Sequence, residues 1–299
     1  MLYEQIAHNK RNTRIVMVMF CLVILAIAWL LAATLSVSVA EIFIVIGLIY
    51  LAYTYFYATR HLMSVTHAVR VTKQDSPEIY ELVEELCLAG GIPMPKIYIT
   101  PDPSPNAFAT GRDPQHASLA LTQGLLKMMN KQEVQGVIGH ELSHIRNYDI
   151  RVTTLSSGLV NLVIKTGLGI VTFAWAMLCS DNDGLLGLLA KFFALFLLVI
   201  GGIITIIGIP IAKLLYFAVS RQREYLADAG SVELTREPSG LISALSKLQR
   251  LEQPAQSTDM MFNALCFNAP APVNFITNLF ADHPALDKRI ARLQKSASI

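Results

Sequence analysis

Charged residues are scarce in this chain of 299 residues. Only 15% are Asp, Glu, Lys or Arg, whereas 53% are hydrophobic and the mean hydropathy is +0.47. A soluble globular protein carries about 25% charged residues, so this scarcity excludes an ordinary soluble domain. The net charge is only +2 and no basic tract occurs, which excludes nucleic acid as a partner. The composition predicts an integral membrane protein with the lipid bilayer as its surroundings.

Cysteines are also few, and none stands in a C-x-x-C arrangement. The four are scattered along the chain, at Cys21, Cys87, Cys179 and Cys266. This spacing excludes a disulfide framework and indicates reduced thiols.

Four long stretches have little or no charge, at residues 15–35, 42–58, 153–179 and 192–211. Stretches of this length can cross about 30 Å of hydrocarbon as helices. We expect the first to be an uncleaved anchor, because the apolar region of a cleavable signal peptide is shorter and a second run follows at once across a loop at 36–41. The third contains Asn161 and Lys165, so the alternative for the last pair is a buried hairpin that does not fully cross. Pro210 is expected to kink the end of the fourth helix.

These stretches divide the chain into four parts. We expect an N-terminal transmembrane hairpin (1–58), a polar part (59–152), a second transmembrane hairpin (153–211) and a second polar part (212–299); the two polar parts are called catalytic parts after the motifs described below. Alternating residues at 96–100 and 117–122, with an extended piece at 106–111, predict a small β-sheet in the first catalytic part. The expected fold class is α+β and mainly helical.

Basic residues predict the orientation. Lys and Arg flank the spans on the side of both termini and both catalytic parts, whereas the loop after the first span has none. The positive-inside rule therefore places the termini and the catalytic parts in the cytoplasm, with the protein in the cell inner (cytoplasmic) membrane.

Residues 140–144 spell H-E-L-S-H, the H-E-x-x-H pattern of zinc-binding helices. Residues four apart lie about 40° apart on one helix face, so His140 and His144 can present both imidazoles to one metal ion. Glu141 points into the same cleft and can take a proton from a water on the metal. The motif therefore predicts a metal site with a catalytic base.

A helix is expected around this motif. Asn130 is a suitable N-cap, Glu133 stands three residues later, and Val134, Val137 and Ile138 follow at helical spacing. The alternative is a surface helix with two histidines, one of them paired with the glutamate.

A catalytic zinc ion usually has three protein ligands and one open position. One known pattern puts a third histidine six residues after the second, but Ile150 stands there. Residues 221–228 instead offer Glu224 and Asp228 on one helix face. Glu224 could reach the metal while Asp228 accepts a hydrogen bond from a ligand imidazole. The alternative for Glu224 is a solvated salt bridge to a neighbouring arginine, which is worth little.

Several motifs together resemble the HtpX family of membrane-bound zinc metalloproteases, in the M48 peptidase group. They are the two hydrophobic pairs, N-A-F-A-T-G at 106–111, H-E-L-S-H at 140–144, R-x-x-E-x-x-A-D at 221–228 and D-H-P at 282–284. The resemblance covers nearly the whole chain and implies Glu224 as third ligand, with one zinc ion per subunit. It also implies membrane quality control, in which misfolded or damaged membrane proteins and unfolded polypeptides are cut. Relatives that process prenylated C-termini carry more hydrophobic spans than this chain, which argues against that activity.

Other residues are expected to serve the substrate. By the same resemblance His283 would donate to the oxyanion, although it could simply cap the chain before Pro284. Asn106, with Ala107, would bind the substrate main chain, or act as a turn residue after Pro105. The strand at 117–122, with Ser118 and Leu119, would be an exposed sheet edge that pairs with an extended substrate.

Three other functions remain as alternatives. Charges close to the motif, at Lys131, Glu133, Arg146 and Asp149, argue against an intramembrane protease. A transporter with an incidental motif is the second alternative, but no inverted repeat is visible. The third is an inactive scaffold, against which the intact Glu141 argues.

Overall fold

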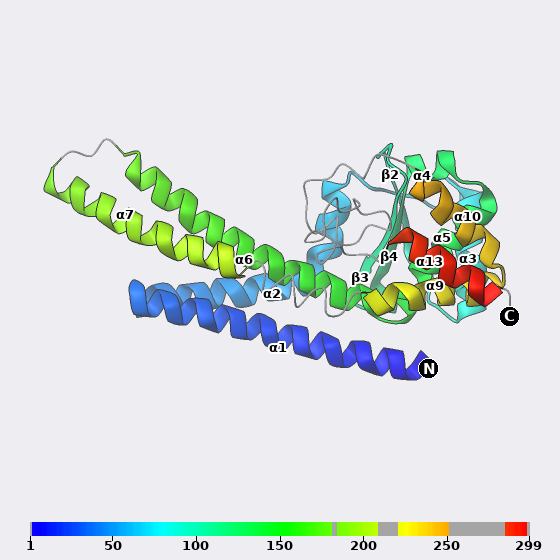
Figure 1. Ribbon diagram of the computed structural model, residues 1–299, viewed down its shortest axis with the longest axis horizontal. Helices are drawn as coiled ribbons and strands as arrows, with labels where there is room; N and C mark the ends of the chain where they lie inside the picture. Colours follow the sequence, from blue (N-terminus) through cyan, green and yellow to red (C-terminus); the bar gives the residue numbers. More distant parts are fainter. Residues whose placement is uncertain (1, 181–183, 209–220, 251–284, 298–299) are drawn as a thin grey trace.

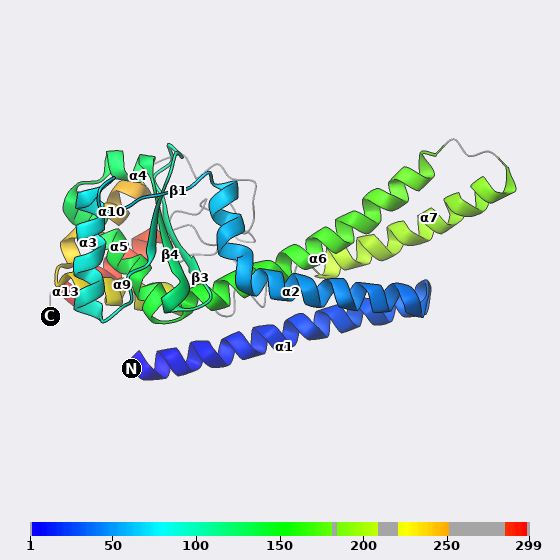
Figure 2. The same cartoon turned by 180° about the vertical axis from the view of Figure 1, so that it is seen from behind.

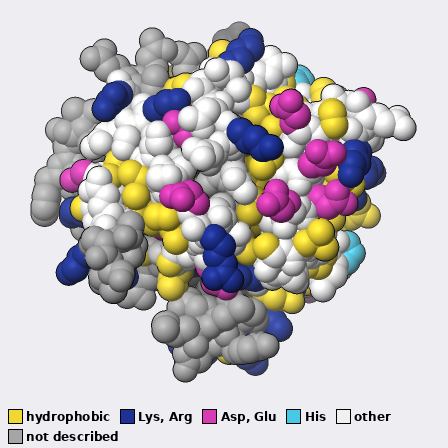
Figure 3. Space-filling view, turned by 90° about the vertical axis from the view of Figure 1, so that its right-hand side faces the viewer, with side chains coloured by type: hydrophobic (Ala, Val, Ile, Leu, Met, Phe, Trp, Pro, Cys, Tyr) yellow, Lys and Arg dark blue, Asp and Glu magenta, His cyan; other side chains and the backbone are white. Residues whose placement is uncertain are grey.

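The computed structural model describes residues 2–180, 184–208, 221–250 and 285–297. Two long helical hairpins project to one side of a part in which helices cover a small β-sheet (Figure 1). The end opposite the hairpins carries acidic and basic side chains interspersed, as a water-exposed surface does (Figure 3). This architecture confirms the expected fold class, a mainly helical membrane protein with a small sheet.

The first hairpin consists of α1 (Leu2–Thr34) and α2 (Val37–Val65). The connection was expected to be a loop at 36–41, but α2 already begins at Val37. Ser36 makes this possible, because its side chain accepts a hydrogen bond from the backbone N–H of Val39 and caps the helix.

The second hairpin consists of α6 (Asp149–Leu178) and α7 (Leu185–Ile203), followed by the π-helical turn η2 (Ile204–Gly208). With α1 and α2, these helices are long and apolar enough to cross a membrane. One buried cluster takes side chains from all four helices, among them Ile27, Ala40, Val160 and Ile200. The two hairpins therefore pack on one another, while large apolar side chains such as Trp29 and Leu186 face outward. Pro210 lies outside the described residues.

Helices α2 and α6 continue past their apolar parts. The expected division points at 58/59 and 152/153 lie inside α2 and α6 respectively. A single continuous helix thus joins each hairpin to the catalytic part, because polar residues at these ends still form helical hydrogen bonds.

The sheet has four strands in the order β1-β2-β4-β3. They are β1 (Val69–Arg70), β2 (Lys96–Thr100), β3 (Ala107–Gly111) and β4 (Ala117–Thr122). Strand β4 pairs in parallel with β2 and antiparallel with β3. The prediction of β4 as a free edge is therefore wrong: both sides of the strand are already hydrogen-bonded, and all its residues are buried.

Side chains alternate between the two faces of this sheet. Leu119 and Leu121 join the main core, with α3 (Pro77–Gly90) and α5 (Lys131–Arg146), whereas Ala120 faces the other way onto the end of α2. Figure 2 shows α3 and α5 on one side of the sheet and the end of α2 on the other. The sheet thus lies between the metal-motif helix and the membrane hairpin.

Helix α5 is enclosed by further helices. They are α9 (Arg221–Thr235), α10 (Pro238–Gln249), α13 (Leu286–Ala297) and the short α4 (Gln123–Met128). Gly136 lets α10 come close, since a Cβ there would lie 2.7 Å from the backbone nitrogen of Leu241. The expected N-cap is confirmed: Asn130 and Glu133 form a reciprocal capping box.

Glu133 also joins α5 to α10. Its carboxylate accepts hydrogen bonds from Ser243 Oγ and Lys247 Nζ, both at 2.7 Å. Burial alone would raise the pKa of Glu133, but Lys247 and the hydrogen bonds from Ser243 and Asn130 outweigh it and hold this pKa below its usual 4.5. The ionised form is therefore favoured by folding, so this stabilisation is complete above about pH 4.5 and is lost as pH falls through the lower folded-state pKa.

We expect Glu133→Gln to lower the free energy of unfolding by about 1–2 kcal/mol at neutral pH, because the amide cannot accept all three bonds. The variant should also lose less stability than the parent between about pH 5 and 3. Denaturant unfolding in detergent at several pH values measures both effects. Glu84→Gln, which breaks the exposed pair with Lys73, is the matched control and should change little. A Glu133→Gln protein with the parent's acid dependence would contradict this account.

Candidate metal centre

Helix α5 presents its two histidines to one point. The imidazoles of His140 and His144, one turn apart, bring their Nε2 atoms within 3.1 Å of each other. His140 is 1% exposed, so this pair lies inside the protein and not on a surface helix.

Helix α9 packs against α5 and supplies the third group. Glu224 Oε2 lies 3.5 Å from His140 Nε2, and Glu224 Oε1 lies 3.6 Å from His144 Nε2. Among the described residues, His140, His144 and Glu224 form the cluster whose ligand atoms all lie within 4.8 Å of one another. The structure thus brings together the three residues expected to bind the metal.

These distances fit zinc. Bonds of about 2.0–2.1 Å at the tetrahedral angle separate neighbouring ligand atoms by roughly 3.3–3.4 Å. The two Nε2 atoms are 3.1 Å apart, and the Glu224 oxygen nearest to each is 3.5 or 3.6 Å away, so these separations are close to that value although each histidine faces a different oxygen of Glu224. A set of two histidines and one glutamate, which leaves a fourth position open, is typical of catalytic zinc sites.

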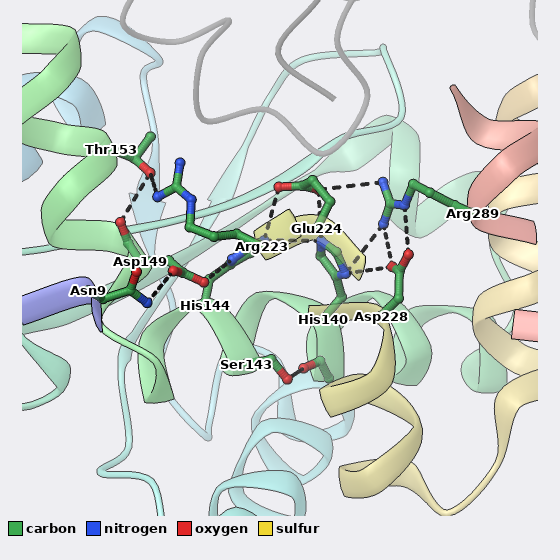
Figure 4. Close-up of polar contacts among 11 residues, drawn as sticks. Asn9, His140, Ser143, His144, Asp149, Thr153, Arg223, Glu224, Asp228 and Arg289 are labelled. Atoms are coloured by element: carbon green, nitrogen blue, oxygen red, sulfur yellow. Dashed lines mark hydrogen bonds and ion pairs between the residues drawn. The ribbon is translucent and has the colours of Figure 1, made fainter. Parts of the chain in front are cut away.

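A second carboxylate stands behind each imidazole (Figure 4). Asp228 Oδ1 lies 3.0 Å from His140 Nδ1, and Asp149 Oδ2 lies 2.9 Å from His144 Nδ1. A carboxylate at this distance accepts a hydrogen bond, so both Nδ1 atoms carry the proton and both Nε2 atoms present lone pairs. The Nε2 lone pairs of both histidines and the Glu224 carboxylate therefore converge with no proton between them. Such a set of electron-pair donors can bind a metal cation.

Arg289 holds Asp228 in place. This arginine of α13 is fully buried and donates to both carboxylate oxygens, at 2.6 and 3.0 Å. Arg289 Nη2 also lies 3.3 Å from His140 Nδ1. Its contact to Asp228 Oδ1 is shorter, at 2.6 Å, so we assign the Arg289 hydrogen bond to Asp228. Burial would raise the pKa of Asp228, yet the Arg289 charge and the His140 hydrogen bond hold it below the usual range.

The same charges act on Arg289 in return. Burial would lower its pKa, but Asp228, Glu224 and Glu141 raise it, so the guanidinium stays charged inside the protein. Glu141 follows His140 directly on α5 and is itself buried, at 3% exposed.

Sequence reasoning missed Arg289 and Asp149. A signal for Arg289 existed: it lies on the apolar stripe formed by Leu286, Ile290 and Leu293, where a charged side chain needs a buried partner. Asp149 was read only as a charge near the motif. It stands five residues after His144, just past the end of α5, where the chain turns back toward the histidine.

The residues expected to bind substrate lie in the sheet. Asn106 is buried at the start of β3, where its backbone N–H donates to Thr122 Oγ1 at 2.8 Å and Ala107 follows in the strand. Ser118 and Leu119 are buried in the inner strand β4, whose main-chain groups are used by β2 and β3. These two residues therefore cannot pair with a substrate strand. His283 lies outside the described residues.

Comparison with known proteins points to one family. The sequence model of peptidase family M48 matches residues 73–297. "Protease HtpX homolog" of Lactobacillus helveticus is 40% identical over 99% of this chain and 100% of its own length. The protein of that name from Lactobacillus acidophilus is 41% identical over 98% and 99%. Among solved structures, S. mikatae Ste24p matches with a TM-score of 0.48 and 18% identity, covering 90% of this chain and 61% of that one.

We expect Arg289→Met to lower the free energy of unfolding by about 3–5 kcal/mol, because it leaves Asp228 buried without its cation. Arg289→Lys should lose less, since it keeps the charge but not the two-point contact. Chemical unfolding in detergent measures the difference. Arg292→Met is the control on the same helix: Arg292 is exposed and, within the described part of the chain, stacks on the Tyr225 ring, 4.6 Å from its centroid. An Arg289→Met protein as stable as the Arg292→Met protein would show that Asp228 does not depend on this cation.

Proposed function

The chain belongs to peptidase family M48, in its HtpX group, and we propose that it is a zinc-dependent endopeptidase that cuts membrane and unfolded proteins at the membrane surface. The observation that carries this proposal is the convergence of two imidazole lone pairs and the Glu224 carboxylate at tetrahedral spacing. His140, His144 and Glu224 would hold one zinc ion per subunit, and its fourth position would face the substrate.

When bound, zinc lowers the pKa of a water molecule and polarises the scissile carbonyl group. The Glu141 carboxylate then takes the proton from the attacking water and returns it to the leaving amine. Asp228 and Asp149 keep the Nδ1 protons of the two histidines in place, so both Nε2 atoms remain free to bind metal. His283 stays our proposed donor to the oxyanion, and Asn106 our proposed contact to the substrate main chain.

The position of the centre suggests the substrate class. Helix α6, a candidate membrane span, begins at Asp149, only five residues after His144. The catalytic groups therefore lie close to the membrane surface, where an unfolded or damaged membrane protein would expose its polypeptide. Quality control of membrane proteins is the activity that this location supports.

The proposed orientation places both termini and the centre in the cytoplasm. The polar ends of α1, α2 and α6 lie together beside the catalytic part, and the other end of α6 lies at the far end of the second hairpin (Figure 1). Lys and Arg are concentrated at the catalytic end of the hairpins, as the positive-inside rule requires of the cytoplasmic side.

We expect Glu141→Gln to retain zinc and to cut casein at least about 100-fold more slowly than the parent, because the amide cannot accept the proton. Glu224→Ala should lose the metal itself. Metal analysis and casein cleavage by the purified protein in detergent test both, with Glu233→Ala as the control on α9, since the exposed Glu233 pairs with Arg146 away from the histidines. A Glu141→Gln protein that cuts as fast as the parent would refute the mechanism.

We expect a membrane-impermeant maleimide to label a protein whose only cysteine is Cys179 from outside intact cells. Cys179 is exposed and ends α6 at the far end of the hairpin. A cysteine-free chain with Leu88→Cys, exposed on α3 of the catalytic part, should react only after the membrane is opened. The reverse pattern would invert the proposed topology.

A further inference from the structure

We propose that Asn9, near the start of the first membrane helix, is a positioning residue of the metal centre: it fixes Asp149 and through it the ligand His144. This inference rests on the proposed function, because it concerns how a zinc ligand is held. It gives the N-terminal anchor a part in metal binding, in addition to holding the protein in the membrane.

The side chain of Asn9 binds two acceptors that lie in one turn, 138 and 140 residues further along the chain (Figure 4). Its Nδ2 donates to the backbone oxygen of Asn147 at 2.8 Å and to Asp149 Oδ1 at 2.7 Å. Both partners are acceptors, so both amide hydrogens are used. Asn9 is 2% exposed, which shields these hydrogen bonds from water.

Asp149 transmits this contact to the ligand. One carboxylate oxygen accepts from Asn9, and the other accepts from His144 Nδ1 at 2.9 Å. With both oxygens bound, the plane of the carboxylate is set, and with it the direction of the imidazole ring. The nearby Thr153 hydroxyl donates to the backbone oxygen of Asp149 and accepts from Arg223 Nη1 at 3.2 Å, so it does not touch the carboxylate oxygens of Asp149.

Asn9 also holds the turn between the metal helix and the second hairpin. Asn147 follows the last residue of α5, where a carbonyl oxygen has no partner within the helix. The next residue, Tyr148, has a φ of 63°, a left-handed conformation that is strained for a side chain of this size. Lys10 lies over its ring, 4.8 Å from the centroid. Two adjacent residues of α1 therefore contact the two turn residues that aim Asp149.

The two histidines are supported differently. Asp228 behind His140 is held by the charge of Arg289, so removal of that arginine leaves a buried carboxylate without its cation. Asp149 behind His144 is held by a neutral amide. Removal of Asn9 would leave the Asp149–His144 hydrogen bond possible but poorly aimed, so the effect should fall on metal binding more than on folding.

The experiment uses the full chain in detergent, loaded with zinc or with Co²⁺ as a spectroscopic probe. We expect Asn9→Ala to weaken zinc binding by about 10–100-fold, measured by competition with a chromogenic chelator, as loss of a group behind a metal ligand does. The Co²⁺ absorption bands should shift, while the melting temperature of the metal-free protein should fall by only a few degrees, as expected for the loss of two buried hydrogen bonds. Asn9→Asp should weaken zinc at least as much, because it places an acceptor 2.7 Å from Asp149 Oδ1.

Thr13→Ala is the matched control. Thr13 lies one turn further along the same face of α1, is equally buried, and donates to the backbone oxygen of Asn9 within the helix. We expect it to bind zinc as the parent does.

Each other outcome overturns the inference. If Asn9→Ala binds zinc as tightly as the parent, Asn9 does not position His144, while the proposed function stands. If Thr13→Ala loses zinc equally, or if Asn9→Ala loses zinc only with melting of the metal-free protein, the contribution of α1 is structural. If the parent itself binds no zinc, the proposed function and this inference fall together.

Discussion

The structure depends on how charge is balanced at one buried point. Four carboxylates and two guanidinium groups, each at most 8% exposed, meet around the two histidines: Glu141, Asp149, Glu224, Asp228, Arg223 and Arg289. With all of them ionised, a divalent cation among the ligand atoms would neutralise the cluster. Buried charges are costly unless they are paired, so the packing of α5, α9 and α13 is favourable only if these groups stay in register. The same buried charged groups therefore determine both the geometry of the metal centre and the stability of the core.

Sequence reasoning predicted what is encoded locally. The capping box at Asn130 and Glu133, the spacing of His140 and His144, and the apolar runs all lie within single helices, where neighbouring residues decide the structure. The placement of Glu224 followed from a motif and a resemblance, and the structure brings it to the histidines. The prediction that β4 is an exposed sheet edge was wrong. Alternation of side chains predicts a strand, but it does not say whether both edges of that strand are paired.

The groups behind the ligands could not be predicted in the same way. Asn9 and His144 are linked only through Asp149, across a separation of about 140 residues, and nothing in the polar sequence around Asn9 distinguishes it. For Arg289 the sequence shows a charged residue on an apolar helix stripe, but it does not indicate which acidic residue the arginine would pair with. Contacts between distant segments arise from packing of the whole fold, and patterns with a period of two or four residues carry no information about them.

The continuity of the helices ties the centre to the bilayer. Only Asn147 and Tyr148 separate helix α5 from the candidate span α6, so the two histidines are tied closely to the end of that helix. Each histidine is in turn supported from one end of the chain: His144 from α1 through Asp149, and His140 from α13 through Asp228. His140, His144 and Glu224 can be aligned only after both the membrane hairpins and the C-terminal helix have docked. A metal ion held by these residues would therefore stabilise only the assembled state, since no preformed site exists in the unfolded chain. A membrane protease built in this way would bring His140, His144 and Glu224 together only in the fully folded chain.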